Sequence, residues 1–198
     1  MTQYILTSPC TAELVEKNSR FIGWGFPCST LKDFNSLHNK MKSEYQDASH
    51  VAYAYLIVED GTQKIRFSDD GEPGGTAGKP ILNHLQGKGL INAVIFVIRY
   101  FGGVKLGAGG LVRAYGGGAR EALAVANIEE YIPVSQLEFT ASYDTQKHIE
   151  YCLKKFDGKT INIEFTEELK YQVSIPERLL RDFRDAVSIK GVLLETED

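Results

Sequence analysis

The sequence predicts an α+β protein of two domains, residues 1–132 and 134–198. Three observations predict this. Strand-like and helix-like segments alternate along the whole chain, and the segments after Pro133 complete a βαββαβ order. The charge balance also changes at that joint: residues 1–135 carry 13 basic and 13 acidic side chains, whereas residues 136–198 carry 9 and 13. We therefore place the domain boundary at Pro133.

The first domain opens with two expected strands, residues 12–17 and 20–28. A helix is expected over residues 30–45, with Ser29 or Thr30 as its cap. Its apolar residues recur every three or four positions, as one buried helix face requires; they are Leu31, Phe34, Leu37, Met41 and Tyr45.

The rest of the first domain alternates turns with regular elements. Glu59-Asp60-Gly61 predicts a hairpin turn, and the near-continuous apolar run before Arg99 predicts a strand buried on both faces. The expected elements are strands 50–58 and 63–68, a helix 79–86 begun by Pro80, the buried strand 91–99 and a helix 109–126.

The second domain needs only about 60 residues for its pattern. The order βαββαβ is that of the split ferredoxin-like arrangement. The expected elements are strands 134–143, 159–166, 169–175 and 191–196, with helices 145–156 and 176–187.

Composition points to a cytoplasmic protein. The 198 residues are 43% hydrophobic and 24% charged, which is ordinary for a globular chain. Cys10, Cys28 and Cys152 form no CxxC pair, so we expect neither disulfides nor a zinc site. The sequence opens without a signal-peptide pattern, and its longest apolar run, residues 93–98, is too short to span a bilayer.

Charge and glycine concentrate in the middle of the chain. Residues 61–120 carry eight basic and three acidic side chains, a local charge of +5 in a protein of net charge −4. Fifteen of the 19 glycines fall between Gly61 and Gly118. Such clustering favours an anionic partner, although solvated surface charge is the alternative.

The loop that contains Asp69, Asp70, Glu72 and Lys79 is a possible site. It is not a P-loop, because Pro73 stands where the first glycine is needed and a proline follows Lys79. Its three carboxylates could bind Mg²⁺ or Ca²⁺, or they could simply form turns. We expect no resident metal or cofactor.

The glycine-rich turn after the buried strand is a candidate phosphate site. A strand, a glycine-rich turn and a helix together present free N–H groups and the positive helix end to an anion. Close packing is the alternative explanation for these glycines, and Tyr100 and Phe101 could stack a base or belong to the core. The residues assigned to the site are Arg99, Tyr100, Gly102, Gly103, Lys105, Gly107, Gly109 and Gly110.

The following helix contains three consecutive glycines, each costing about 1 kcal/mol against alanine. Gly118 shares a face with apolar residues and favours close packing on the sheet. Gly116 and Gly117 lie between Arg113 and Arg120, which are seven positions apart on one face. Bare backbone between two guanidiniums predicts a phosphodiester site, with packing as the alternative.

The motifs closely resemble the Impact/YigZ family. They are FSDDGEPGGTAGKP from Phe67 to Pro80, RYFGGVKLGAGGLVRAY from Arg99 to Tyr115, KNSRFI from Lys17 and DASH from Asp47. The resemblance implies a first domain like the second domain of small-subunit ribosomal protein five. It implies a second domain like one in the C-terminal half of elongation factor G.

The resemblance also implies a link to translation, which eukaryotic Impact proteins regulate. The sequence shows no counterpart of their additional N-terminal partner-binding domain, so their regulatory partner is not expected here. We expect binding to RNA or a ribosome-associated factor through the glycine- and arginine-rich face. The alternatives are a metal-dependent hydrolase using Asp69, Asp70 and Glu72 with His50, and a protein-interaction module. No nucleophile–base signature is present, so no catalytic residue is assigned.

Overall fold

The computed structural model describes residues 2–59, 61–189 and 192. It divides the chain into two compact units, Met1–Tyr131 and Ile132–Asp198, each mixing helices with sheet. Within the described residues, none of the helices combines the length and the hydropathy needed to cross a membrane.

The first unit is built on a five-stranded antiparallel sheet with the order β2-β3-β6-β4-β5. Its middle strand is buried from Ala93 to Arg99, as the apolar run predicts. The strands are β2 (Cys10–Glu16), β3 (Ser19–Pro27), β4 (His50–Glu59), β5 (Thr62–Ser68) and β6 (Ala93–Tyr100).

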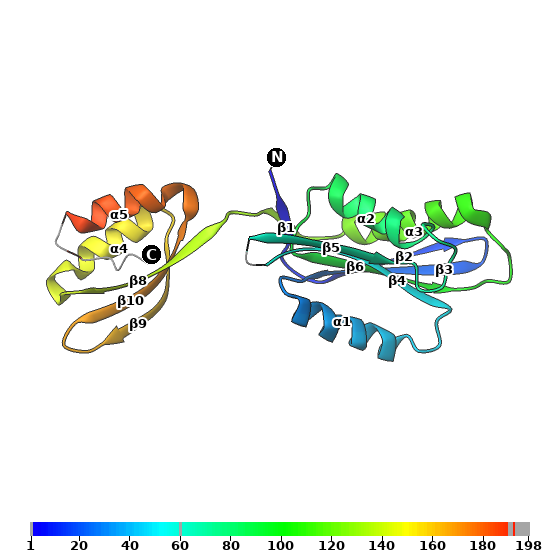
Figure 1. Cartoon of the computed structure of the whole chain (residues 1–198), viewed down its shortest axis with the longest axis horizontal. Coiled ribbons are helices and arrows are strands. Elements are labelled where there is room, and N and C mark those ends of the chain that lie inside the picture. The colour runs from blue at the N-terminus through cyan, green and yellow to red at the C-terminus, as the bar shows by residue number, and fades with distance from the viewer. Residues whose placement is uncertain (1, 60, 190–191, 193–198) are drawn as a thin grey trace. The chain divides into compact units, whose positions relative to one another are not determined.

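Helices cover both faces of this sheet (Figure 1). α1 (Leu31–Glu44) lies on one face, and α2 (Gly78–Gly87) and α3 (Gly107–Ala124) lie on the other. Thr30 caps α1, because its hydroxyl accepts from Asp33 N and its own N–H donates to the Asp33 carboxylate. α3 begins and ends two residues earlier than the predicted helix 109–126, because its first turn already lies within the glycine-rich segment that starts at Gly107.

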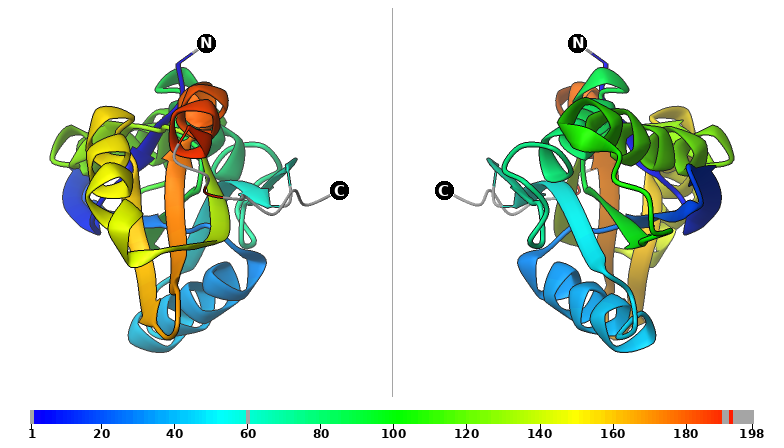
Figure 2. Two further views of the ribbon diagram at one scale, coloured as in Figure 1. Left: turned by 90° about the vertical axis from the view of Figure 1, so that its left-hand side faces the viewer. Right: turned by 90° about the vertical axis from the view of Figure 1, so that its right-hand side faces the viewer.

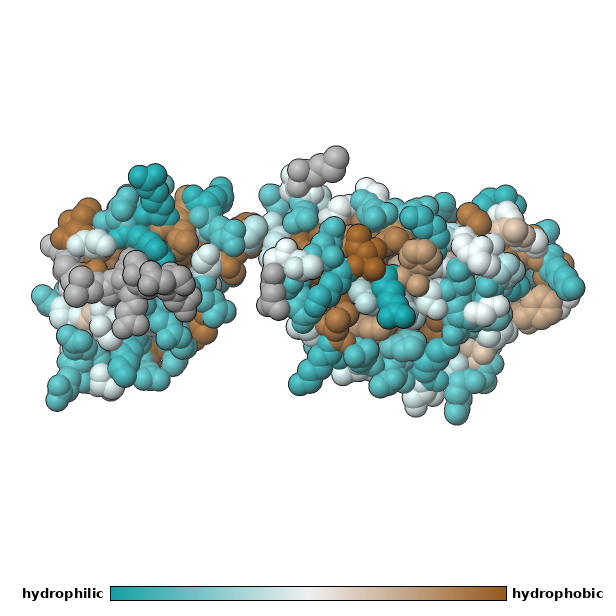
Figure 3. Space-filling view, viewed as in Figure 1, coloured by the Kyte–Doolittle hydropathy of each residue, from teal (hydrophilic) through white to brown (hydrophobic). Residues whose placement is uncertain are grey.

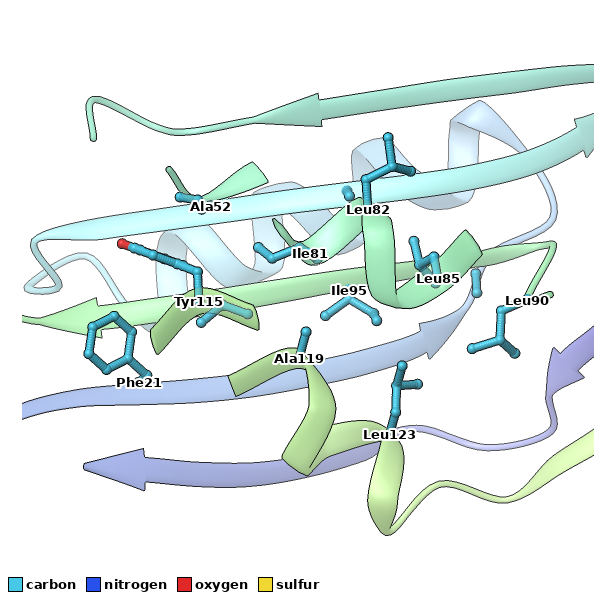
Figure 4. Close-up of a cluster of buried hydrophobic side chains, with 14 of the residues drawn as sticks. Phe21, Ala52, Ile81, Leu82, Leu85, Leu90, Ile95, Tyr115, Ala119 and Leu123 are labelled. Carbon is cyan, nitrogen blue, oxygen red and sulfur yellow. The ribbon is translucent and has the colours of Figure 1, made fainter. Parts of the chain in front are cut away.

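The core beneath α2 and α3 is closely packed (Figure 4). Tyr115 of α3 meets Phe21 of β3 edge to face, with ring centroids 5.2 Å apart. A Cβ on Gly23 of β3 would lie 2.2 Å from the backbone oxygen of Gly118. The glycines therefore let α3 lie directly on the sheet, as the pattern around Gly118 predicts.

Two short strands were not apparent in the sequence. β1 (Tyr4–Leu6) pairs antiparallel with β7 (Ile128–Glu130) and brings the two ends of the first unit together. Three-residue strands are too short to show an alternating pattern. β5 is an edge strand of the five-stranded sheet, and its residues Ile65 and Phe67 are exposed. Figure 3 shows hydrophobic surface over β5 among polar side chains.

The second unit has a three-stranded antiparallel sheet with the order β8-β10-β9. Its two helices pack on one face of that sheet (Figures 1 and 2). A 3₁₀ turn, Tyr143–Thr145, ends at the first residue of the predicted helix 145–156, and another, Glu177–Leu179, falls in the first turn of the predicted helix 176–187. Apart from Val192, the strand expected at 191–196 lies outside the described residues. The elements are β8 (Val134–Ala141), η1 (Tyr143–Thr145), α4 (Gln146–Lys155), β9 (Lys159–Phe165), β10 (Leu169–Pro176), η2 (Glu177–Leu179) and α5 (Leu180–Ser188).

Candidate nucleic-acid-binding site

Asp69 organises the acidic loop between β5 and α2. Its carboxylate accepts hydrogen bonds from the backbone N–H groups of Gly75, Ala77 and Gly78 at 2.8–2.9 Å. Burial alone would raise the pKa of Asp69, but the three N–H donors together lower that pKa below its ordinary value. Asp69 is therefore an ionised acceptor that holds the loop closed.

Asp70 connects the same loop to the elements beside it. Its carboxylate accepts from Lys42 Nζ of α1 at 2.6 and 2.7 Å and from the backbone N–H of Val51 at 2.6 Å. Its backbone has a φ of 49°, in the left-handed region that Asp tolerates. Both oxygens of Asp70 are thus used within the protein.

Glu72 lies at the centre of a buried polar cluster. Its Oε1 accepts from Arg99 Nη1 at 2.6 Å and from the Tyr115 hydroxyl at 2.8 Å, and His50 Nε2 lies 3.8 Å away. The Glu72 and Arg99 side chains are 4% and 7% exposed. Burial, and then the hydrogen bond to Glu72, raises the pKa of Tyr115, so this hydroxyl stays protonated and donates.

These contacts give the carboxylates of the loop a structural role, in contrast to the metal-dependent hydrolase alternative. All three acids of the loop accept hydrogen bonds from the protein's own donors, and the Lys79 ammonium lies over the Phe67 ring, 5.9 Å from its centroid. In the part of the chain that the structure describes, no group of three His, Cys, Asp or Glu side chains could hold a metal ion. The loop is built as a structural element between α1, β6 and α3.

The residues of the turn after β6 make different contacts and differ in exposure. The Tyr100 hydroxyl donates to Asp47 at 2.8 Å, and Gly102 N donates to Ser19 Oγ at 3.1 Å. Gly103 and Gly107 have φ of 84° and 70°, which glycine adopts without strain. Phe101, for which the sequence left core and surface open, is 49% exposed.

Gly116 and Gly117 are buried rather than bare on the surface. A Cβ on Gly116 would lie 3.2 Å from His84 Nε2, and one on Gly117 would lie 2.6 Å from Leu14 Cδ2. A side chain at Gly116 or Gly117 would therefore press on the His84 or Leu14 side chain, so packing accounts for these glycines. The two residues nevertheless line a hollow of about 460 Å³.

Basic side chains surround this hollow, which we call the basic hollow. Lys17 from the β2–β3 turn joins Arg113 and Arg120 of α3 along it, with Glu16 as the acidic residue among its described lining. Arg120 pairs with its neighbour Glu121 at 2.8 Å, whereas Arg113 and Lys17 form no ion pair with any described residue. The sequence predicted the two arginines but not Lys17 or His84.

His84 lies on the α2 side of the basic hollow. Burial, and then the positive charges of Arg120 and Lys88, lowers the pKa of His84. The imidazole is therefore neutral at neutral pH, and the positive charge of the hollow comes from lysine and arginine. Their guanidinium and ammonium groups can donate hydrogen bonds to phosphate oxygens.

The remaining predicted residues lie at the first turn of α3. Lys105 and Gly107 line a neighbouring hollow together with Arg99, and Leu106 lines both hollows. Gly109 is exposed, whereas Gly110 is buried against Leu106. The structure thus brings Lys105, Arg113 and Arg120 to one part of the first unit and places Arg99 in a buried ion pair.

Known proteins resemble this chain over most of its length. The family model described as the Impact N-terminal domain matches residues 17–123. The IMPACT family member YigZ of Escherichia coli is 35% identical over 180 residues, covering 90% of this chain and 88% of that protein. The IMPACT family member YvyE of Bacillus subtilis is 35% identical over 174 residues, covering 87% and 79%.

A solved structure also matches. It is described as the crystal structure of a hypothetical protein, is 32% identical, and covers 100% of this chain and 98% of its own, with a TM-score of 0.71. The family evidence therefore extends over both units of the chain.

Proposed function

This chain belongs to the Impact family, and we propose that it acts in translation by binding RNA or a ribosome-associated RNA surface through the basic hollow. The observation that carries the proposal is the position of Lys17 and Arg113, two cations without an ion-pair partner among the described residues, on one hollow with Arg120. The link to translation comes from the family resemblance.

Phosphate is the ligand that fits these groups. Arginine binds phosphate oxygens through parallel N–H donors, and lysine contributes a point charge. The hollow is open to solvent and holds more cations than carboxylates among its described lining. Contacts of this kind act on the nucleic-acid backbone and carry no sequence information.

The same proposal includes the domain identities that the resemblance implies. The antiparallel order β8-β10-β9 supports a ferredoxin-like second unit related to a domain of elongation factor G, because that arrangement places its third strand between the first two. We propose a first unit related to the second domain of small-subunit ribosomal protein five.

The test is salt-dependent binding of a labelled single-stranded RNA, measured by anisotropy from about 50 to about 200 mM salt. Each neutralised phosphate adds about 0.7 to the slope of log K against log salt. We expect Arg113→Ala and Lys17→Ala each to weaken binding and to reduce that slope by about 0.7. Lys32→Ala, on α1 at the opposite face of the sheet, is the matched control.

Two results would count against the proposal. Wild-type protein that binds no RNA at low salt would favour the protein-interaction module instead. Equal losses in Lys32→Ala and Arg113→Ala would show that binding follows net charge and not the basic hollow. Circular dichroism of each variant establishes that it is folded.

A further inference from the structure

A second hollow, of about 300 Å³, opens at the first turn of α3 and adjoins the basic hollow through Leu106. We infer that it receives one unpaired base of the bound RNA and prefers cytosine to uracil. The inference rests on the proposed RNA binding and adds the part of the RNA that is recognised. Three features of the hollow, which we call the base pocket, carry it.

The polar end of the base pocket is the buried pair of Glu72 and Arg99. The contacts of Glu72 with Arg99, Tyr115 and His50 all involve its Oε1 atom. Its other carboxylate oxygen, Oε2, accepts no hydrogen bond from any described residue. Arg99 Nε is buried and has no partner among those residues either. A buried donor without a partner is costly, and both residues line this hollow, so the free carboxylate oxygen of Glu72 points to a ligand that can donate a hydrogen bond to it.

The wall of the base pocket is aromatic and apolar. Phe101 is half exposed although it lies next to buried Arg99, whose guanidinium is 5.3 Å from its ring centroid. Pro73, Leu106 and Leu111 complete the wall. A planar ligand can stack on such a ring, as unpaired bases do on aromatic side chains.

The rim of the base pocket is positive. Lys105, Gly107 and Ala108 line it at the start of α3. The N-cap residue of this helix, Leu106, has no side-chain acceptor, so the first N–H groups of α3 lack a side-chain cap. Uncapped N–H groups beside a lysine suit the phosphate of the nucleotide whose base enters the pocket.

The carboxylate of Glu72 determines which base fits. It can only accept hydrogen bonds when ionised, so it favours a base edge with an amino group. Cytosine presents an N4 amino group where uracil presents the O4 oxygen. The two rings have the same size, and their edges are reversed at this exocyclic group and at the adjacent N3, which accepts in cytosine and donates in uracil, so they make a matched pair. Inorganic phosphate alone would use neither Phe101 nor Glu72.

The experiment compares labelled oligo(C) and oligo(U) RNAs of equal length by anisotropy at one low salt concentration. We expect wild-type protein to bind oligo(C) roughly tenfold more tightly, the effect of one hydrogen bond to a charged group. Phe101→Leu keeps an apolar side chain but removes the ring. It should weaken oligo(C) binding by about five- to 150-fold and reduce the difference between the two RNAs.

Two further variants separate the base from the phosphate. Phe101→Tyr retains a ring and should keep both the affinity and the preference. Lys105→Ala should weaken both RNAs equally, because a phosphate contact is independent of the base.

Equal binding of the two RNAs, unaffected by Phe101→Leu but weakened by Arg113→Ala, would overturn the base pocket and leave the proposed function intact. No binding of either RNA would overturn both. Amide spectra of the first turn of α3 give an independent measurement: oligo(C) should shift the signals of Gly107 and Ala108 in wild-type protein. Binding without those shifts would also overturn the base pocket.

Discussion

Arg99 of β6 donates to Glu72 of the acidic loop over 2.6 Å, and both side chains are buried. Tyr115 of α3 donates to the same carboxylate oxygen. A single oxygen atom therefore joins the loop, the middle strand of the sheet and the long helix. Glu72 and Arg99 of this junction line the hollow that we propose to be the base pocket.

Glu72→Gln should strongly destabilise the first unit. The substitution keeps the shape of the side chain but leaves the Arg99 charge buried without a counter-charge, which costs about 3–5 kcal/mol. Glu121→Gln, which removes one partner of the exposed Arg120 pair, should cost no more than about 1 kcal/mol. Urea unfolding measures both free energies, and similar values for the two variants would contradict the prediction.

Gly23→Ala should destabilise the packing of α3 on β3. The added methyl would lie 2.2 Å from the backbone oxygen of Gly118, so helix or strand must shift, at a cost of about 1–3 kcal/mol or more. Gly74→Ala is the control, because its added methyl meets no atom within 4 Å. We expect it to be neutral or to stabilise by up to about 1 kcal/mol. Melting temperatures that fall equally in both would refute this explanation of the close approach.

Asp69→Asn should reduce the dependence of stability on acid pH. The folded-state pKa of Asp69 is lowered from its ordinary value of 3.8, so its contribution is present above that pH and is lost as the pH falls through the folded-state pKa. The stability difference between wild type and Asp69→Asn should therefore shrink below pH 3.8. Urea midpoints from neutral to acid pH measure it, with Glu44→Gln on exposed α1 surface as control. A difference that is the same at every pH would refute the prediction.

The segment Ile132–Asp198 should fold when it is expressed alone. It has its own sheet, two helices and a separate hydrophobic core. A domain with its own core can fold independently. Dispersed amide spectra and a cooperative melt are the expected results, and a chain with neither would show that it depends on the first unit.

Local patterns were sufficient to predict most helices and strands. The apolar run before Arg99 predicts β6 because a strand covered on both faces must be apolar throughout. The threonine cap and the three-to-four spacing predict α1. Both signals lie within a few residues of the element that they specify. The pairing of β1 with β7 has no such signal, because each strand is only three residues long.

The candidate site was predictable only in part. The glycines and arginines of α3 are visible in the sequence, and their local charge indicates an anionic partner. The sequence also suggested a bare glycine face, but the structure buries Gly116 and Gly117 under His84 and Leu14. Spacing shows which helix face a residue occupies, and it does not show what packs on that face.

The sequence by itself therefore indicated a mixed fold of helices and sheets, the family and the region of chain that holds the candidate site, since composition, periodicity and motif are local properties. Tertiary structure decided which side chains these residues contact. Glu72 meets Arg99 across 27 positions of chain, and Lys17 joins Arg113 from a turn much earlier in the sequence. The physical reason is that a charged side chain pairs with whatever counter-charge or solvent lies beside it in the folded protein. Only the packing of the sheet and helices determines which of these it meets.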